Sequence, residues 1–195
     1  MTTGGDSAEE KARRIFTQFS TRNPAPQFAA YSPMSSILDI FESNLHDLEW
    51  RYQLDEEHEL LRFGVNCANG SFEVIIHVVA DIDLVKCFTL YPVRVPEERR
   101  AAVAEYLTRA NYGLLFGNFE MDYADGEVRF RTSMNTDDAA INSVVARHLL
   151  QQNVNTADRY FNGLLRVVYG ALAPASAIQE AENVPERHLG EDDET

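Results

Sequence analysis

This chain of 195 residues is 45% hydrophobic and 25% charged, which is the composition of an ordinary globular protein. It carries 31 acidic against 17 basic side chains, for a formal net charge of −14 at pH 7. That balance argues against binding to bare nucleic acid or to an anionic membrane, because neutralising phosphates requires clustered Lys and Arg. The length fits one domain with tails.

Both ends of the chain differ from its middle. Residues 1–31 have a short helical spacing of apolar residues around Ile15 and Phe19, and we expect a flexible N-terminal extension there. The alternative is an arm that docks on a partner or on the domain itself. Residues 174–195 are acidic and end in EDDET, which predicts a disordered tail because so polar a segment buries too little apolar surface. The folded domain is therefore expected over residues 32–173.

The first half of this domain predicts one helix and then four antiparallel strands. Pro33 follows Ser32, a typical first helical position after a typical N-cap, so the helix is expected over residues 33–45. Asn69 and Gly70 favour a tight hairpin between the second and third strands. Alternating apolar and polar residues place the strands at about 48–55, 61–67, 71–80 and 84–93.

The third of these strands is apolar on both faces. One face carries large apolar residues throughout, and the other carries Ile75, His77 and Val79. Such a strand is central in its sheet, or its second face meets another surface. We therefore take these three residues as candidate partner-binding residues, in a homodimer or against another protein. Helices of the same chain on both faces would instead leave a monomer.

The second half predicts a helix, a hairpin and a further helical segment. The first helix is expected from Pro96 to Asn111, and the hairpin turns on Asp125-Gly126. The last segment is expected over residues 137–172, with an interruption at 153–156.

Alternation in the hairpin assigns side chains to its two faces. The inward face is expected to hold Leu115, Phe119, Met121 and Tyr123. Opposite charges are expected to pair across the outer face, which holds Glu120, Asp122, Arg129 and Arg131. The alternative is an anion site at the two arginines. The whole order predicts an α+β fold with a single antiparallel sheet and flanking helices.

The sequence contains no recognisable catalytic motif. It holds no phosphate-binding loop, no nucleophile elbow and no zinc-binding histidine spacing, so we expect no enzyme activity, cofactor or metal. Cys67 and Cys87 lack CxxC spacing and are expected to be free thiols. With no signal peptide and no long apolar run, the sequence favours the cytoplasm. The alternative is a small-molecule sensor or enzyme with a pocket between helix and sheet, around His77 and Tyr106.

Part of the chain resembles the YbjN family of bacterial domains. The resemblance rests on these residues: Val95-Pro96-Glu97-Glu98-Arg99-Arg100, Tyr106-Leu107, Asn111, Phe116-Gly117-Asn118-Phe119-Glu120-Met121-Asp122 and Gly126-Glu127-Val128-Arg129-Phe130-Arg131. It implies a fold similar to type III secretion chaperones and a non-enzymatic, chaperone-like or regulatory module that binds another protein. It brings no catalytic residues to this chain.

Overall fold

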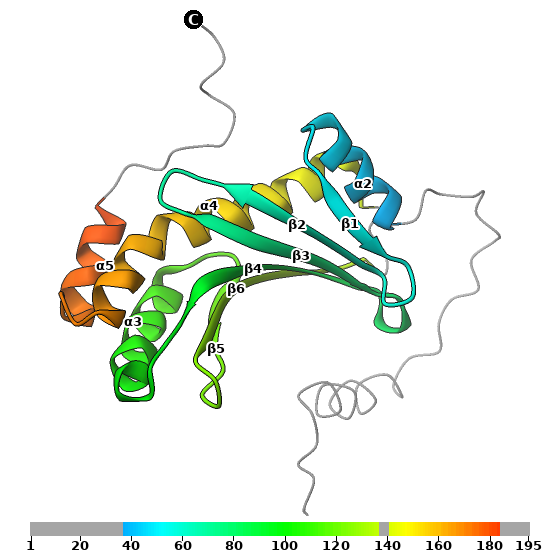
Figure 1. The fold of residues 1–195 in the computed structure, drawn as a ribbon. Coiled ribbons are helices and arrows are strands. Elements are labelled where there is room, and N and C mark those ends of the chain that lie inside the picture. Colours follow the sequence, from blue (N-terminus) through cyan, green and yellow to red (C-terminus); the bar gives the residue numbers. More distant parts are fainter. Residues whose placement is uncertain (1–36, 137–140, 184–195) are drawn as a thin grey trace, which may run out of the picture. The chain divides into compact units, whose positions relative to one another are not determined.

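The computed structural model describes residues 37–136 and 141–183. These residues form one six-stranded antiparallel sheet and four α-helices (Figure 1). The predicted α+β class with a single antiparallel sheet is therefore confirmed. The expected extension over residues 1–31 lies outside the described residues.

The sheet consists of a four-strand meander and a hairpin, as the alternation of side chains predicts. Its strands are β1 (Tyr52–Asp55), β2 (Leu60–Asn66), β3 (Ser71–Val79), β4 (Leu84–Arg94), β5 (Asn118–Met121) and β6 (Glu127–Asn135). They are ordered β1-β2-β3-β4-β6-β5, so β6 joins the hairpin to the meander through β4. The first strand is shorter than expected, because it begins only at Tyr52.

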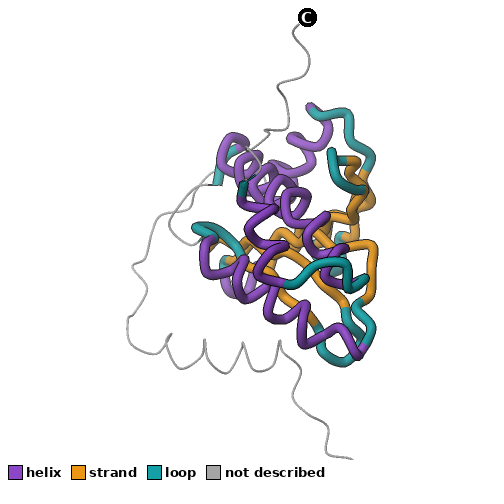
Figure 2. The backbone as a smooth tube through the Cα atoms, turned by 90° about the vertical axis from the view of Figure 1, so that its left-hand side faces the viewer, coloured by secondary structure: helices purple, strands orange, loops and turns teal. Residues whose placement is uncertain are grey.

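The helices pack against one face of the sheet (Figure 2). They are α2 (Ile37–Asp47), α3 (Arg100–Gly113), α4 (Ser143–Val168) and α5 (Pro174–Glu182). The longest, α4, crosses β4 and β6, α2 contacts α4 and β2, and α3 contacts β5. A short 3₁₀ turn, η2 (Glu97–Arg99), leads from Pro96 into α3. The core therefore lies between the sheet and the helices, and α2, α3, α4 and α5 all contribute buried residues to it.

The expected interruption at residues 153–156 is wrong, because α4 runs through them without a break. Asn153 is fully buried and turns its amide toward the sheet. It donates to the Cys87 carbonyl at 2.9 Å and to the Thr132 hydroxyl at 3.1 Å, and it accepts from the Thr89 hydroxyl at 2.6 Å. An Asn side chain with such partners no longer competes for the helix backbone, so the helix continues.

The expected disorder from residue 174 onward is wrong for its first part, where the chain forms α5. Pro174 stands at the start of this helix, where its missing N–H costs nothing. Ala177, Ile178 and Ala181 are buried, and α5 contacts both α3 and α4. Apolar residues at helical spacing thus supply enough contact with two neighbouring helices to order the segment. Residues 184–195 lie outside the described residues.

The hairpin turns where the sequence predicts, at Asp125-Gly126. Gly126 has φ +77°, and a Cβ there would stand 2.2 Å from the Val95 carbonyl oxygen, so only glycine fits. The expectation that Leu115 and Tyr123 point inward is wrong. They lie outside the short β5 strand and are 91% and 57% exposed.

Candidate functional site

The face of the sheet opposite the helices carries apolar side chains on both sides of His77 and Lys86, and we call it the open face. Side chains on this face alternate with the buried ones, so they belong to every second residue of each strand. On β3 and β4 they form a partly exposed strip, named here the apolar strip: Ile75, Val79, Leu84, Phe88 and Leu90.

The candidate residues Ile75, His77 and Val79 do share this open face. Each is partly exposed, and His77 lies between Leu60 of β2 and Lys86 of β4 in the sheet register. The sequence placed them on one face because residues two apart in a strand point the same way. Their role in binding a partner stays a prediction.

Sequence reasoning missed the contribution of β4 to this face. Ile75 stands opposite Phe88, and Val79 stands opposite Leu84, so β4 doubles the width of the apolar strip. The signal was present, because β4 also alternates between two apolar sets, one buried and one on the open face. Which strand lies beside β3 on each side is a tertiary property that the alternation alone does not give.

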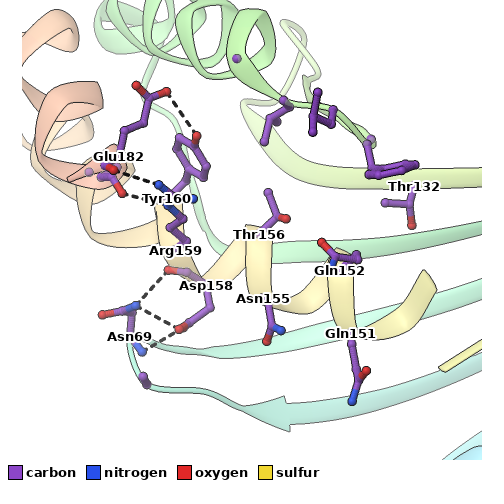
Figure 3. Close-up of a pocket in the computed structure, with 18 of the residues that line it drawn as sticks. Asn69, Thr132, Gln151, Gln152, Asn155, Thr156, Asp158, Arg159, Tyr160 and Glu182 are labelled. Atoms are coloured by element: carbon purple, nitrogen blue, oxygen red, sulfur yellow. Dashed lines mark hydrogen bonds between the residues drawn. The ribbon is translucent and has the colours of Figure 1, made fainter. Parts of the chain in front are cut away.

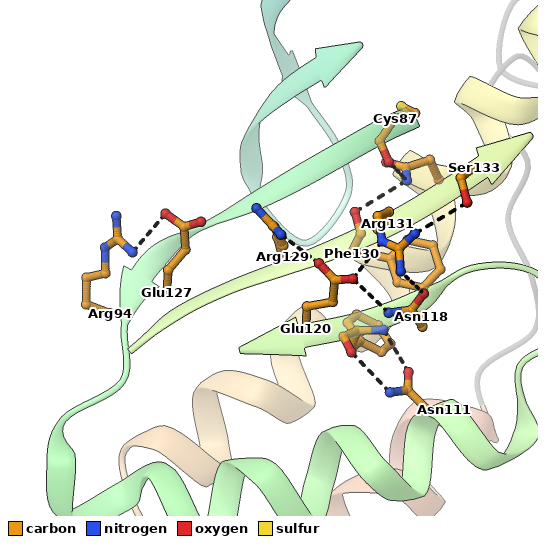
Figure 4. Close-up of polar contacts among 12 residues, drawn as sticks. Cys87, Arg94, Asn111, Asn118, Glu120, Glu127, Arg129, Phe130, Arg131 and Ser133 are labelled. Atoms are coloured by element: carbon orange, nitrogen blue, oxygen red, sulfur yellow. Dashed lines mark hydrogen bonds and ion pairs between the residues drawn. The ribbon is translucent and has the colours of Figure 1, made fainter. Parts of the chain in front are cut away.

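Charged side chains border the apolar strip on both sides. Arg62 and Glu73 form an ion pair at 2.7 Å beside β3. On the other border, Glu120 accepts from Arg129 Nε at 2.8 Å and from Arg131 Nε at 2.6 Å (Figure 4). This confirms the predicted cross-strand pairing of Glu120.

Asp122, which was expected to join the same charged face, instead lies in the β5–β6 loop. One of its carboxylate oxygens accepts a hydrogen bond from the Ala124 amide at 2.7 Å. It therefore serves the turn and leaves Glu120 between the two arginines, as Figure 4 shows.

The arginine pair sets the charge state of Glu120. Burial alone would raise the pKa of this carboxyl, but hydrogen bonds from Arg131 and Arg129 outweigh burial and hold the pKa below its ordinary value. Glu120 is therefore ionised at neutral pH and stays a hydrogen-bond acceptor for both guanidinium groups. Arg129 also lies over the ring of Phe88, with its Cζ 4.6 Å from the ring centre.

The pocket suggested around His77 and Tyr106 does not form, because the structure separates the two residues. Tyr106 is fully buried in α3, and its hydroxyl donates to the Tyr160 carbonyl of α4 at 2.8 Å. His77 lies on the opposite side of the sheet, on the open face. A sensor or enzyme site built from this pair is therefore excluded.

A concave surface elsewhere on the molecule is a broad groove along α4, with a volume of about 1740 Å³ (Figure 3). Much of its lining is polar and includes the side chains His148, Gln151, Gln152, Asn155 and Thr156. Hydrogen bonds hold its far end: the Asn69 side chain donates to Asp158 Oδ2 at 3.0 Å, and the Tyr160 hydroxyl bonds to Glu182 at 3.4 Å.

One wall of this groove is the α3–β5 loop, which exposes large apolar side chains. Leu115 is 91% exposed and Phe116 is 71% exposed, and both line the groove. Tyr112, at the end of α3, is 96% exposed. Large apolar residues gathered within a few positions on a surface are typical of interaction sites. Sequence reasoning missed this loop because it extended the β5 strand back to Leu115.

The two cysteines are free thiols in the structure. Burial raises the pKa of the Cys67 thiol to about 12, with a smaller contribution from the nearby Asp158 carboxylate. Burial also raises the pKa of Cys87. Both thiols are therefore protonated at neutral pH and are weak nucleophiles.

Among residues 37–136 and 141–183, no three or more His, Cys, Asp or Glu side chains are grouped so that they could hold a metal ion. None of the helices in these ranges has the length and apolarity needed to cross a bilayer.

Residues 38–166 match the sequence model of the YbjN family, described as "Putative bacterial sensory transduction regulator". The match covers nearly all of α2, the whole sheet, α3 and nearly all of α4. A search of curated proteins finds no match.

Proposed function

The chain belongs to the YbjN family, and we propose that it is a regulatory or adaptor module that acts by binding a segment of another protein rather than by catalysis. The observation that carries this proposal is the apolar strip on the open face. Ile75 lies opposite Phe88 there, and Val79 lies opposite Leu84, on the side of the sheet away from α4. An apolar patch rimmed by charged residues is typical of a protein interface.

The groove along α4 supports a polypeptide partner as well. Its volume of about 1740 Å³ is larger than the range of about 300–1,000 Å³ that is usual for small-molecule sites. The exposed Leu115 and Phe116 beside it would gain most from contact with an apolar segment. A polypeptide accounts for the size of the groove and for its apolar wall together.

A second copy of the chain is the other occupant that would suit the apolar strip. Two open faces placed around a two-fold axis would bring β3 and β4 of one protomer against β3 and β4 of its partner. Light scattering over a range of concentrations decides this point. A mass of one chain throughout would remove the homodimer and leave the open face to a different protein.

We also expect the protein to work in the cytoplasm. Its two cysteines, Cys67 and Cys87, are both free, as a reducing compartment favours.

The experiment that tests the proposal compares two substitutions of the same kind at different surfaces. Ile75→Asp places a charge in the apolar strip, and Val144→Asp places one at the exposed start of α4, where Val144 is 61% exposed. The wild type and both variants are used as affinity baits, with partners identified by mass spectrometry. We expect Ile75→Asp to lose a partner that Val144→Asp retains. Equal capture by all three baits would exclude the open face as the binding site.

A further inference from the structure

We infer that the open face recognises an acidic polypeptide segment, and that Arg129 receives a carboxylate of that segment beside the apolar strip. This inference rests on the proposed function and adds the chemistry of the partner. It follows from the environment of one guanidinium group, from the charges around the apolar strip and from the position of Glu120.

Arg129 presents an unused pair of hydrogen-bond donors at the edge of the apolar strip. Its Nε donates to Glu120 at 2.8 Å, and its guanidinium lies over the Phe88 ring. Within the described residues its two Nη atoms donate to no acceptor, and the side chain is 41% exposed. Two parallel donors on a planar group suit a carboxylate, which accepts both at once. The contact with Phe88 holds the plane in place before any partner arrives.

The charges bordering the apolar strip favour an acidic partner. The sheet register places five cations against four carboxylates on the open face: Arg62, Lys86, Arg94, Arg129, Arg131, Asp55, Glu73, Glu120 and Glu127. The chain as a whole has a net charge of −14, so the open face carries a small positive excess on an otherwise acidic protein. An acidic segment would be attracted here and repelled elsewhere, which gives both selectivity and orientation.

The neighbours of Arg129 indicate that the partner segment also carries apolar residues. Leu90 lies directly opposite Arg129 in the register between β4 and β6, and Phe88 lies under its guanidinium. A carboxylate bound to Arg129 would therefore bring its flanking residues onto Leu90, Phe88 and Ile75. The segment that fits has acidic residues next to large apolar ones.

Glu120 occupies part of the place that the partner's carboxylate would take. It accepts from both Arg129 and Arg131, so it offsets the positive charge of the border and competes for the same donors. Neutralising it would release both guanidinium groups without removing them. Glu120→Gln is therefore expected to strengthen binding of an acidic segment. If Glu120 only supported the fold, the same substitution would weaken binding.

Two fluorescein-labelled peptides of equal length test this inference by fluorescence anisotropy. One contains Glu, Leu and Ser, and the other has Gln at each Glu position. The full-length wild type should bind the Glu peptide at least about tenfold more tightly than the Gln peptide, as one good charge-assisted pair predicts. High salt should reduce that difference, because the pair is partly exposed.

Three variants assign the effect to the open face. Arg129→Gln should weaken binding of the Glu peptide about tenfold and leave the Gln peptide unchanged, and Glu120→Gln should strengthen binding of the Glu peptide several-fold. Arg109→Gln is the matched control, because Arg109 forms an exposed ion pair with Glu105 on α3 at 2.8 Å. It should bind both peptides as the wild type does.

Several outcomes would overturn the inference. Equal binding of the two peptides would do so, as would an equal loss in Arg109→Gln and Arg129→Gln, or weaker binding in Glu120→Gln. Anionic phospholipid vesicles are a further arm, and vesicle binding that depends on Arg129 without peptide binding would assign the face to a membrane. If the partner captured through Ile75 shows no dependence on Arg129, the acidic-segment inference fails and the proposed function stands. If no partner is captured through Ile75 and neither peptide binds, both the proposed function and the acidic-segment inference fail.

Discussion

The hydroxyl of Thr89 on β4 donates a 2.6 Å hydrogen bond to the side-chain oxygen of Asn153 on α4, in the layer between helix and sheet. Both residues are fully buried. The Asn153 amide continues the network to the Cys87 carbonyl at 2.9 Å. This contact fixes the position of α4 along the sheet, because its partners lie on two neighbouring strands, β4 and β6.

Asn153→Ala should destabilise the protein by about 2–4 kcal/mol, since it leaves several buried polar groups without a partner and creates a small cavity. Chemical denaturation measures the loss. Asn155→Ala, two residues along the same helix and only partly buried, is the control and should change stability by less than about 0.5 kcal/mol. A loss below about 1 kcal/mol for Asn153→Ala would show that water replaces the amide without cost.

Phe119→Ala should cost about 3–5 kcal/mol, the range for large aromatic truncations in a core. Phe119 is 4% exposed, and its ring lies 4.7 Å from that of Phe130 and 5.3 Å from that of Tyr160. Phe116→Ala removes the same ring three residues earlier, where it is 71% exposed, and should leave stability nearly unchanged. Similar losses for the two variants in urea denaturation would mean that Phe119 is not a core residue.

Gly163→Ala should destabilise the contact between α3 and α4 by about 1–3 kcal/mol, the usual cost of overpacking. A Cβ at this position would stand 2.4 Å from the Tyr106 hydroxyl oxygen. Tyr106→Phe removes that oxygen, so the double variant should recover part of the loss. A double-mutant cycle on thermal unfolding measures the coupling, and strictly additive effects would contradict a direct clash.

Ile75 and Ile76 are adjacent residues of β3 that point to opposite faces of the sheet. Ile76→Asp should unfold the protein, because Ile76 is fully buried and a charge there has no partner. Ile75→Asp should leave a folded chain, since Ile75 lies partly exposed on the open face. Circular dichroism separates the two outcomes. An unfolded Ile75→Asp variant would mean that the open face is covered in the native protein.

Cys67 should make stability depend on alkaline pH. Because burial raises the pKa of its thiol to about 12 in the folded chain, the protonated thiol stabilises the fold fully below the unfolded pKa of about 8.5. That contribution is lost as the pH rises toward the folded pKa. The wild type should therefore lose more stability than Cys67→Ser between about pH 8.5 and 11. Parallel pH profiles in urea denaturation would contradict the shift.

The sequence alone was enough for the fold class and for the turns. Alternation with period two marks β2 to β6, and Asn69-Gly70 and Asp125-Gly126 mark two hairpins, because side-chain direction and turn geometry depend on nearby residues. The same local rule places Ile75, His77 and Val79 on one face of the sheet from their spacing alone.

Only the tertiary structure decided the remaining features, since each depends on residues far away in the chain. The unbroken course of α4 depends on hydrogen bonds from Asn153 to β4 and β6, and the order of α5 depends on its contacts with α3 and α4. The position of Arg129 over Phe88 depends on β6 pairing with β4, which no local pattern specifies. Local periodicity fixes which way a side chain points, whereas its neighbours are fixed by how distant elements pack.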